Sequence, residues 1–249
     1  MASEILHFRD LPSPNHTARP EGTPIDTLVL HYTGMVDTKA ALALLRDPAA
    51  AVSCHYLVAH DGTVWRMVAE DRRAWHAGVS YWRGRGGLND RSIGIEIANA
   101  GHSHGYPDFP VLQLAVVCDL CLDIMSRHRI ARRDVVGHSD IAPERKDDPG
   151  EKFDWRGFAA AGVGLWPEGV PDLGTGGIMR DAAILREARA GLASIGYRIA
   201  PEGALDPALS IVLRAFQRHW RPEAVTGQPD IGTLARIAAV ARLIDATTL

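Results

Sequence analysis

The sequence predicts an α/β fold in which helices flank a central mixed sheet, followed by a small C-terminal three-helix domain. Over the first two thirds of the chain, short apolar β-branched runs alternate with helical patterns. A Pro- and Gly-rich stretch at residues 167–177 then has the composition of a linker. Only helical periodicity follows it. We therefore expect one domain in residues 1–170 and a second, helical domain in residues 178–249.

The first elements are an arm, a strand and a short helix. Residues 1–26 contain four prolines and no sustained periodicity, so we expect an irregular N-terminal arm wrapped over the domain. Residues 27–34 form an apolar run that ends in His31 and a strand-breaking glycine, as a buried strand would. Asp37 or Thr38 can cap a short helix, which stops before the next proline.

A hairpin, a long loop and a second central strand come next. Residues 56–59 and 63–68, separated by a glycine-containing turn, predict a β-hairpin. Residues 75–89 are rich in Gly and Arg and predict a long functional loop. Residues 92–98 alternate, so their isoleucines should pack on helices. Glu96 then projects from the opposite face, between small neighbours that leave room above it; a solvated strand face is the alternative.

The remaining elements are mostly helices. Residues 110–129 predict a long amphipathic helix with a proline in its first turn. Residues 135–137 predict a short strand that ends at a glycine. Three helical patterns follow the linker, at residues 178–195, at 207–220, and from 230 to the end.

The stretch after the strand at residues 135–137 carries most of the chemistry. It contains His138, Lys146 and the adjacent carboxylates Asp147 and Asp148, in a loop that its prolines keep from continuing as a helix or central strand. Histidine and aspartate supply ligands that zinc accepts, and a catalytic zinc site takes three protein ligands. His31, at the end of its strand, is the natural further ligand. A histidine taken alone is more often structural than a ligand.

Three motifs occur along the chain in the order that one enzyme family has them, which makes the resemblance specific. They are Val29-Leu30-His31-Tyr32-Thr33, Ser92-Ile93-Gly94-Ile95-Glu96-Ile97 and Gly137-His138-Ser139-Asp140-Ile141-Ala142-Pro143, with Arg145-Lys146 and Asp148-Pro149-Gly150 after the last. Together they resemble the zinc-dependent N-acetylmuramoyl-L-alanine amidases. The nearest group is the 1,6-anhydro-N-acetylmuramyl-L-alanine amidases of cell-wall recycling and their periplasmic relatives. The resemblance covers roughly residues 20 to 170.

The resemblance implies a reaction and a site. The reaction is hydrolysis of the amide between N-acetylmuramic acid, or its 1,6-anhydro form, and L-alanine in peptidoglycan or muropeptides. The implied zinc ligands are His31, His138 and Asp148. Glu96 is the implied general base, and Lys146 the cation beside the tetrahedral oxygen. The aspartate before Asp148 has no counterpart in the family, so we expect it to be a solvated neighbour.

The C-terminal part has a resemblance of its own. Four short motifs in it are similar to the three-helix peptidoglycan-binding domain often fused to wall hydrolases: Gly196-Tyr197, Gly203-Ala204-Leu205-Asp206, Phe216-Gln217 and Thr226-Gly227-Gln228-Pro229-Asp230. The match covers roughly residues 178 to 245. The alternative is a generic small helical bundle, because periodicity by itself indicates only helices.

Other residues are candidates for binding roles. We expect Trp75 and His76 to line the substrate groove, since aromatic faces suit sugar rings, although ordinary packing is the alternative. His102 and His104 could share a metal, with an exposed loop as the alternative. Two other functions fit parts of the pattern: a non-catalytic peptidoglycan-recognition module, and another wall hydrolase such as a D-Ala carboxypeptidase.

Composition narrows the partners. A net charge of −3 gives no broad attraction to nucleic acid, and no apolar run is long enough to span a membrane. We expect a monomer that acts on a peptidoglycan or muropeptide substrate. No secretory signal is visible at the N-terminus, which favours a cytoplasmic enzyme, or a periplasmic one if a signal has been removed. The peptidoglycan-binding motifs favour contact with polymeric wall instead.

Overall fold

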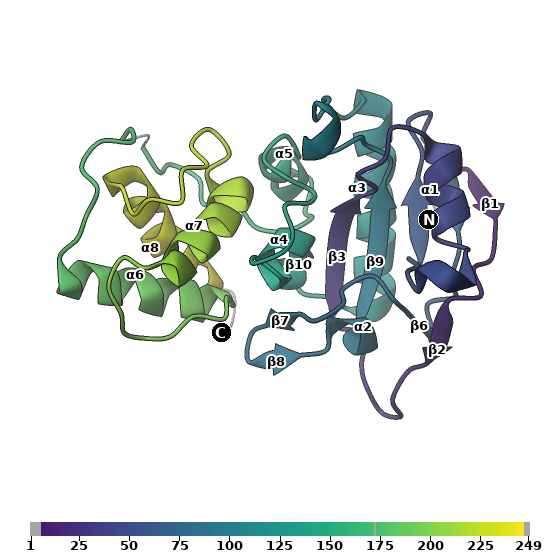
Figure 1. The fold of residues 1–249 in the computed structure, drawn as a ribbon, viewed down its shortest axis with the longest axis horizontal. Coiled ribbons are helices and arrows are strands. Elements are labelled where there is room, and N and C mark those ends of the chain that lie inside the picture. Colours follow the sequence, from purple (N-terminus) through teal and green to yellow (C-terminus); the bar gives the residue numbers. More distant parts are fainter. Residues whose placement is uncertain (1–5, 172, 247–249) are drawn as a thin grey trace.

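The computed structural model describes residues 6–171 and 173–246, and a six-stranded mixed sheet forms the centre of their first part (Figure 1). In spatial order the strands are β1 (Phe8–Asp10), β5 (Val64–Arg66), β4 (Tyr56–Val58), β9 (Ser92–Ile97), β3 (Thr27–Tyr32) and β10 (Val135–Gly137). Neighbouring strands are parallel except in the predicted β4–β5 hairpin. The predicted mixed sheet is confirmed.

The N-terminal arm is more regular than its sequence indicates. Strand β1 pairs in parallel with β5 at the edge of the sheet, and β2 (His16–Ala18) pairs antiparallel with β6 (Arg72–Ala74). The prediction of an irregular arm is therefore wrong for these residues. Strands of three residues are too short to show periodicity, and the edge of an existing sheet supplies their hydrogen-bond partners. Residues 1–5 of the arm lie outside the described residues.

Helices cover both faces of the sheet. Helix α3 (Val111–His128) packs on one face, against leucines of β3 and the three isoleucines of β9. Helix α1 (Thr38–Leu44) packs beside Leu57 on the other face, and the Asp37 side chain caps it. The alternation predicted for β9 is thus observed, and α3 begins directly after the proline expected in its first turn.

The face away from α3 receives the polar residues of the central strands. The register of β3 and β9 sets His31 opposite Glu96, and both side chains lie on this face. Paired positions on neighbouring strands are about 4.8 Å apart. The two predicted site residues therefore start side by side near the carboxyl ends of parallel strands, where α/β sheets usually bind ligands.

Short elements fill the connections. The long loop predicted at residues 75–89 contains a small hairpin, β7 (Tyr81–Trp82) and β8 (Arg85–Gly86), and leads into α2 (Leu88–Arg91). Residues after β10, expected as a loop, begin with a helical turn, α4 (His138–Ile141), and α5 (Trp155–Ala160) follows. Short 3₁₀ turns span Pro48–Ala50, His102–His104 and Arg132–Asp134.

The described residues of the C-terminal part form three helices, as predicted. They are α6 (Ala182–Ile195), α7 (Pro207–Trp220) and α8 (Ile231–Ala246). Residues 167–177, apart from the undescribed residue 172, contain no helix or strand. Within the described chain, none of the helices combines the length and apolar character needed to cross a membrane.

The two parts of the chain share apolar packing. One buried cluster joins Val29, Trp82 and Ile141 to Leu213 and Phe216 of α7. Figure 1 shows α4 and α5 between the sheet and the C-terminal helices. The linker is therefore not the only connection between the two parts. The domain limits at residues 170 and 178 stay predictions.

Candidate active site

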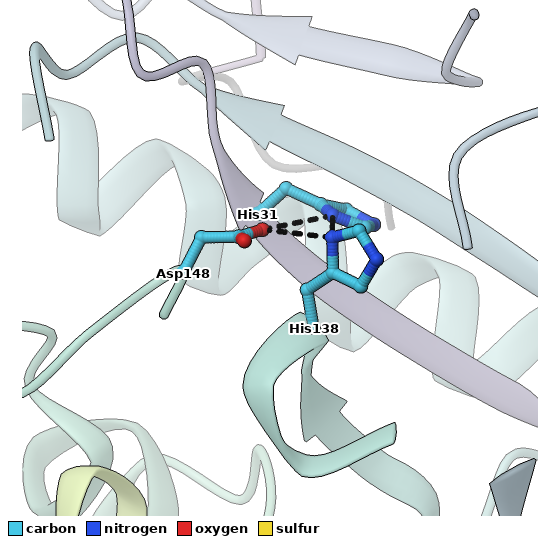
Figure 2. A group of neighbouring side chains, drawn as sticks. All are labelled: His31, His138 and Asp148. Carbon is cyan, nitrogen blue, oxygen red and sulfur yellow. Dashed lines mark hydrogen bonds and ion pairs between the residues drawn. The ribbon is translucent and has the colours of Figure 1, made fainter. Parts of the chain in front are cut away.

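Three predicted ligand side chains meet at the carboxyl edge of the sheet (Figure 2). His31 comes from β3, His138 is the first residue of α4, and Asp148 lies in the loop that follows. His31 Nδ1 is 2.9 Å from His138 Nδ1, and each nitrogen is 3.1 Å from Asp148 Oδ2. All three side chains are buried. Such a convergence of lone pairs needs a cation or a shared proton, so the cluster can hold a metal ion.

Burial and mutual contact set the charges of this cluster. Burial, helped by neighbouring His138, lowers the pKa of His31 to about 4. Burial alone would raise the pKa of Asp148, but the two histidines bring it below its usual range. His31 is then neutral and Asp148 ionised at neutral pH, which are the forms that bind metals.

His76 lies behind His31. His31 Nε2 is 3.0 Å from His76 Nδ1, His76 Nε2 is 3.2 Å from Ser92 Oγ, and that hydroxyl donates to the Leu88 carbonyl. Because the Ser92 hydroxyl donates to Leu88, His76 donates from Nε2 to Ser92 and accepts at Nδ1 from His31 Nε2. His31 Nδ1 is then unprotonated and can bind a metal ion. His76 was predicted to line the substrate groove; it does border the pocket, but its ring nitrogens are used to orient His31.

Gly94 leaves space for the His76 ring, and Asn89 holds the backbone of His76 in place. A Cβ on Gly94 of β9 would lie 2.5 Å from the His76 ring, so only glycine fits beneath it. Asn89 Oδ1 accepts hydrogen bonds from the backbone N–H groups of His76 and Ala77, at 3.0 and 2.7 Å. Asn89 was missed by the sequence analysis, because a single polar residue at the end of an aperiodic loop carries no signal of its role.

A pocket of about 240 Å³ opens above the cluster. Glu96, Lys146 and half-buried Trp75 line it together with two of the ligands, so the predicted catalytic pair and the predicted aromatic wall face one space. Its opposite wall is apolar and comes largely from α1 and the residues flanking it: Met35, Ala41, Leu44, Leu45 and Val52.

Glu96 has the properties of a proton acceptor. Its Oε2 atom is buried and has no hydrogen-bond partner among the described residues. Burial raises the pKa of Glu96 well above its usual range; the carboxylate of Asp148 adds to the rise, and the charge of Lys146 opposes it. A carboxyl group with a raised pKa takes up and releases protons more readily near neutral pH.

The other metal candidates of the sequence lie elsewhere. His102 Nδ1 is 2.9 Å from the Tyr32 hydroxyl, and its Nε2 is 3.1 Å from Glu151. Within the described residues, only the cluster of Figure 2 groups three potential ligands, so His102 and His104 do not form a second metal site there. Asp147 is exposed, as expected, and also forms an ion pair with Arg218 of α7 at 2.6 Å.

Two family models match the chain. Residues 21–151 match the model described as N-acetylmuramoyl-L-alanine amidase, and residues 182–237 match one described as a peptidoglycan binding domain. The first match contains the three candidate ligands and Glu96.

Individual relatives agree with these matches. The N-acetylmuramoyl-L-alanine amidase AmiD of Escherichia coli is 39% identical over 233 residues, which cover 85% of this chain and 80% of the relative. The 1,6-anhydro-N-acetylmuramyl-L-alanine amidase AmpD of Enterobacter cloacae is 37% identical, over 63% of this chain and 90% of the relative.

Solved structures are similar over nearly the whole chain. AmiD of Escherichia coli, in complex with anhydro-N-acetylmuramic acid-L-Ala-D-γ-Glu-L-Lys, has a TM-score of 0.76 at 35% identity and covers 90% of this chain and 92% of that one. AmpDh3 of Pseudomonas aeruginosa has a TM-score of 0.77 at 34% identity and covers 91% and 95%. The similarity thus includes both parts of the chain.

Proposed function

The chain belongs to the N-acetylmuramoyl-L-alanine amidase family, and from this premise we propose that it is a zinc hydrolase that cuts the amide between N-acetylmuramic acid and L-alanine. The observation that carries the proposal is the buried triangle of His31, His138 and Asp148, two members of which line a pocket together with Glu96 and Lys146.

The donor set fits zinc. Two imidazole nitrogens and one carboxylate oxygen are ligands that catalytic zinc accepts, and three protein ligands are the number that such sites use. In a tetrahedral site with ligands about 2.0–2.1 Å from the ion, two ligand atoms are about 3.3 Å apart. The three distances of 2.9–3.1 Å between the ligand atoms are slightly shorter, so a small expansion suffices. Zinc bound there would lower the pKa of water toward about 7 and polarise a carbonyl group.

The side chains around the triangle would perform the proton transfers. Glu96 would accept a proton from the attacking water and pass it to the amine of L-alanine as the amide breaks. Lys146 would stand near the developing oxyanion, where one donor is typically worth about 3 kcal/mol of barrier. Trp75 would offer an aromatic face to the sugar or peptide.

The relatives suggest the form of the substrate. AmiD and AmpDh3 have been solved with anhydromuropeptides, and we propose that this chain also accepts 1,6-anhydro-N-acetylmuramyl peptides. The match of residues 182–237 to a peptidoglycan binding domain supports contact with polymeric wall as well. The cytoplasmic location stays a prediction, which fractionation of cells with an antibody to the protein would test.

Product analysis tests the proposal. Purified protein with zinc should release a free peptide beginning with L-alanine from anhydro-muropeptides or from sacculi, and a chelator should stop the release until zinc is returned. Mass spectrometry separates the alternatives. Loss of D-alanine with an intact muramyl–peptide bond would indicate a carboxypeptidase. Binding of wall fragments without cleavage by zinc-loaded protein would indicate a recognition module.

A further inference from the structure

A buried carboxylate, Asp140, joins the ligand-bearing turn α4 to the C-terminal helical domain. Asp140 is 1% exposed. Its Oδ1 accepts a hydrogen bond from the Tyr197 hydroxyl at 2.5 Å, and its Oδ2 accepts one from His219 Nδ1 at 2.7 Å. Because an ionised carboxylate only accepts, His219 carries its proton on Nδ1. Tyr197 follows α6 and His219 belongs to α7, so both donors come from the C-terminal domain.

Hydrogen bonds of the α4 turn connect Asp140 to the segments that hold two metal ligands. Asp140 Oδ2 also accepts the backbone N–H of Gly137 at 2.7 Å, the residue directly before His138. The backbone N–H of Ser139 donates to the carbonyl oxygen of Asp148 at 2.8 Å. His138 Nε2 is buried without a hydrogen-bond partner in the described part of the chain, so apart from the contacts of Nδ1 within the cluster the turn positions this ring.

Helix α7 makes a second contact beside the other ligand. Arg218, next to His219 in sequence, forms an ion pair with Asp147, which directly precedes Asp148. The ring of His219 is stacked between Trp155 and Trp220, with centroids 3.7 and 4.0 Å away. This stacking fixes the direction of the hydrogen bond to Asp140. Two consecutive residues of α7 therefore support the two segments that hold His138 and Asp148.

We propose that Tyr197, His219 and Arg218 of the C-terminal domain are positioning residues for the metal site, so that this domain sets metal affinity in addition to any contact with the wall. The inference rests on the metal site of the proposed function and deepens it. Partners that orient metal ligands typically change metal affinity by 10–100-fold when they are removed. These residues act one step further away, so we expect about 10-fold weaker zinc binding when both donors to Asp140 are removed.

The test uses the full chain and measures zinc affinity by competition with a chelator. The double variant Tyr197→Phe/His219→Phe keeps the aromatic rings and removes both hydrogen bonds to Asp140. His219→Asn keeps a donor near the Nδ1 position and should retain affinity closer to wild type. Tyr197→Phe removes one hydroxyl only, and provides the measurement if the double variant does not fold.

A matched control separates positioning from general loss of stability. Arg189 is buried in the same domain and donates to Asp206 at 2.7 Å, within the domain and away from α4. Arg189→Gln should lower the melting temperature and leave zinc affinity unchanged. If Arg189→Gln weakens zinc binding as much as Tyr197→Phe/His219→Phe at equal loss of stability, the positioning role is wrong.

The outcomes also distinguish this inference from the proposed function. Equal zinc affinity of the wild type and His31→Ala would overturn the metal site, and with it the proposed function. A second outcome would overturn only the present inference. In it, His31→Ala loses zinc but the double variant binds zinc within about twofold of wild type. If the double variant does not fold, Tyr197→Phe is measured in its place. The expected result is about 10-fold weaker zinc binding in the folded double variant and a zinc affinity closer to wild type in His219→Asn.

Discussion

Replacing Glu96 by glutamine should lower turnover by about 100-fold or more while zinc stays bound, because a general base contributes at least this much. A 100-fold loss corresponds to about 2.7 kcal/mol in the activation barrier. The amide has the same volume but cannot accept a proton. Since Glu96 Oε2 makes no hydrogen bond with the described residues, the substitution breaks no contact of that atom. Burial disfavours the ionised form of Glu96 and raises its pKa, so a neutral amide should not lower the melting temperature.

The assay is release of free peptide from an anhydro-muropeptide under zinc saturation, with metal content and melting temperature measured on the same samples. Glu144→Gln is a matched control, since it removes one carboxylate from an exposed position in the loop that carries Asp148. It should keep normal turnover. Zinc-loaded Glu96→Gln with more than about one tenth of wild-type turnover would refute the role of Glu96 as base.

Three further predictions concern the metal site and stability. Asp148→Ala should lose zinc and turnover together while Asp147→Ala keeps both at saturating zinc; metal analysis showing the reverse would reassign the ligand. Gly94→Ala should weaken zinc binding in chelator competition, because the new methyl group would lie 2.5 Å from the His76 ring. Unchanged affinity would mean that His76 does not orient the metal ligand His31. Burial would raise the pKa of Glu70, but hydrogen bonds from an arginine, a histidine and a tyrosine lower it to about 2 from 4.5. Its stabilisation is therefore complete above pH 4.5 and lost as pH falls toward 2. The melting-temperature difference between wild type and Glu70→Gln should shrink over that range, and a constant difference would contradict the assignment.

The local pattern of the chain was enough to predict the main elements. In residues 92–97 strict alternation separates the isoleucines from Glu96, because successive side chains of a strand point to opposite faces. Apolar runs that end in His31 and His138 likewise mark strand ends, where parallel strands bring functional residues to one edge. The helices after the linker were predicted from their periodicity, and the structure adds capping aspartates such as Asp206.

Short strands were missed for a related reason. The three residues of β1 and of β2 have no local pattern, and they become strands only because an edge of β5 or β6 is available beside them. The position of His76 behind His31 depends in the same way on distant residues, namely the absent side chain of Gly94 and the hydroxyl of Ser92.

By itself, the sequence indicated the order of the main elements and the family, since strand alternation and motif spacing are local properties. Its resemblance to that family implied His31, His138 and Asp148 as the metal ligands. Only the tertiary structure decided how the C-terminal helices meet the site. Tyr197 and His219 are 57 and 79 residues from Asp140, so no local pattern of the sequence indicates the contact. Burial of one carboxylate between two domains makes these hydrogen bonds necessary, because a buried charge without partners is costly.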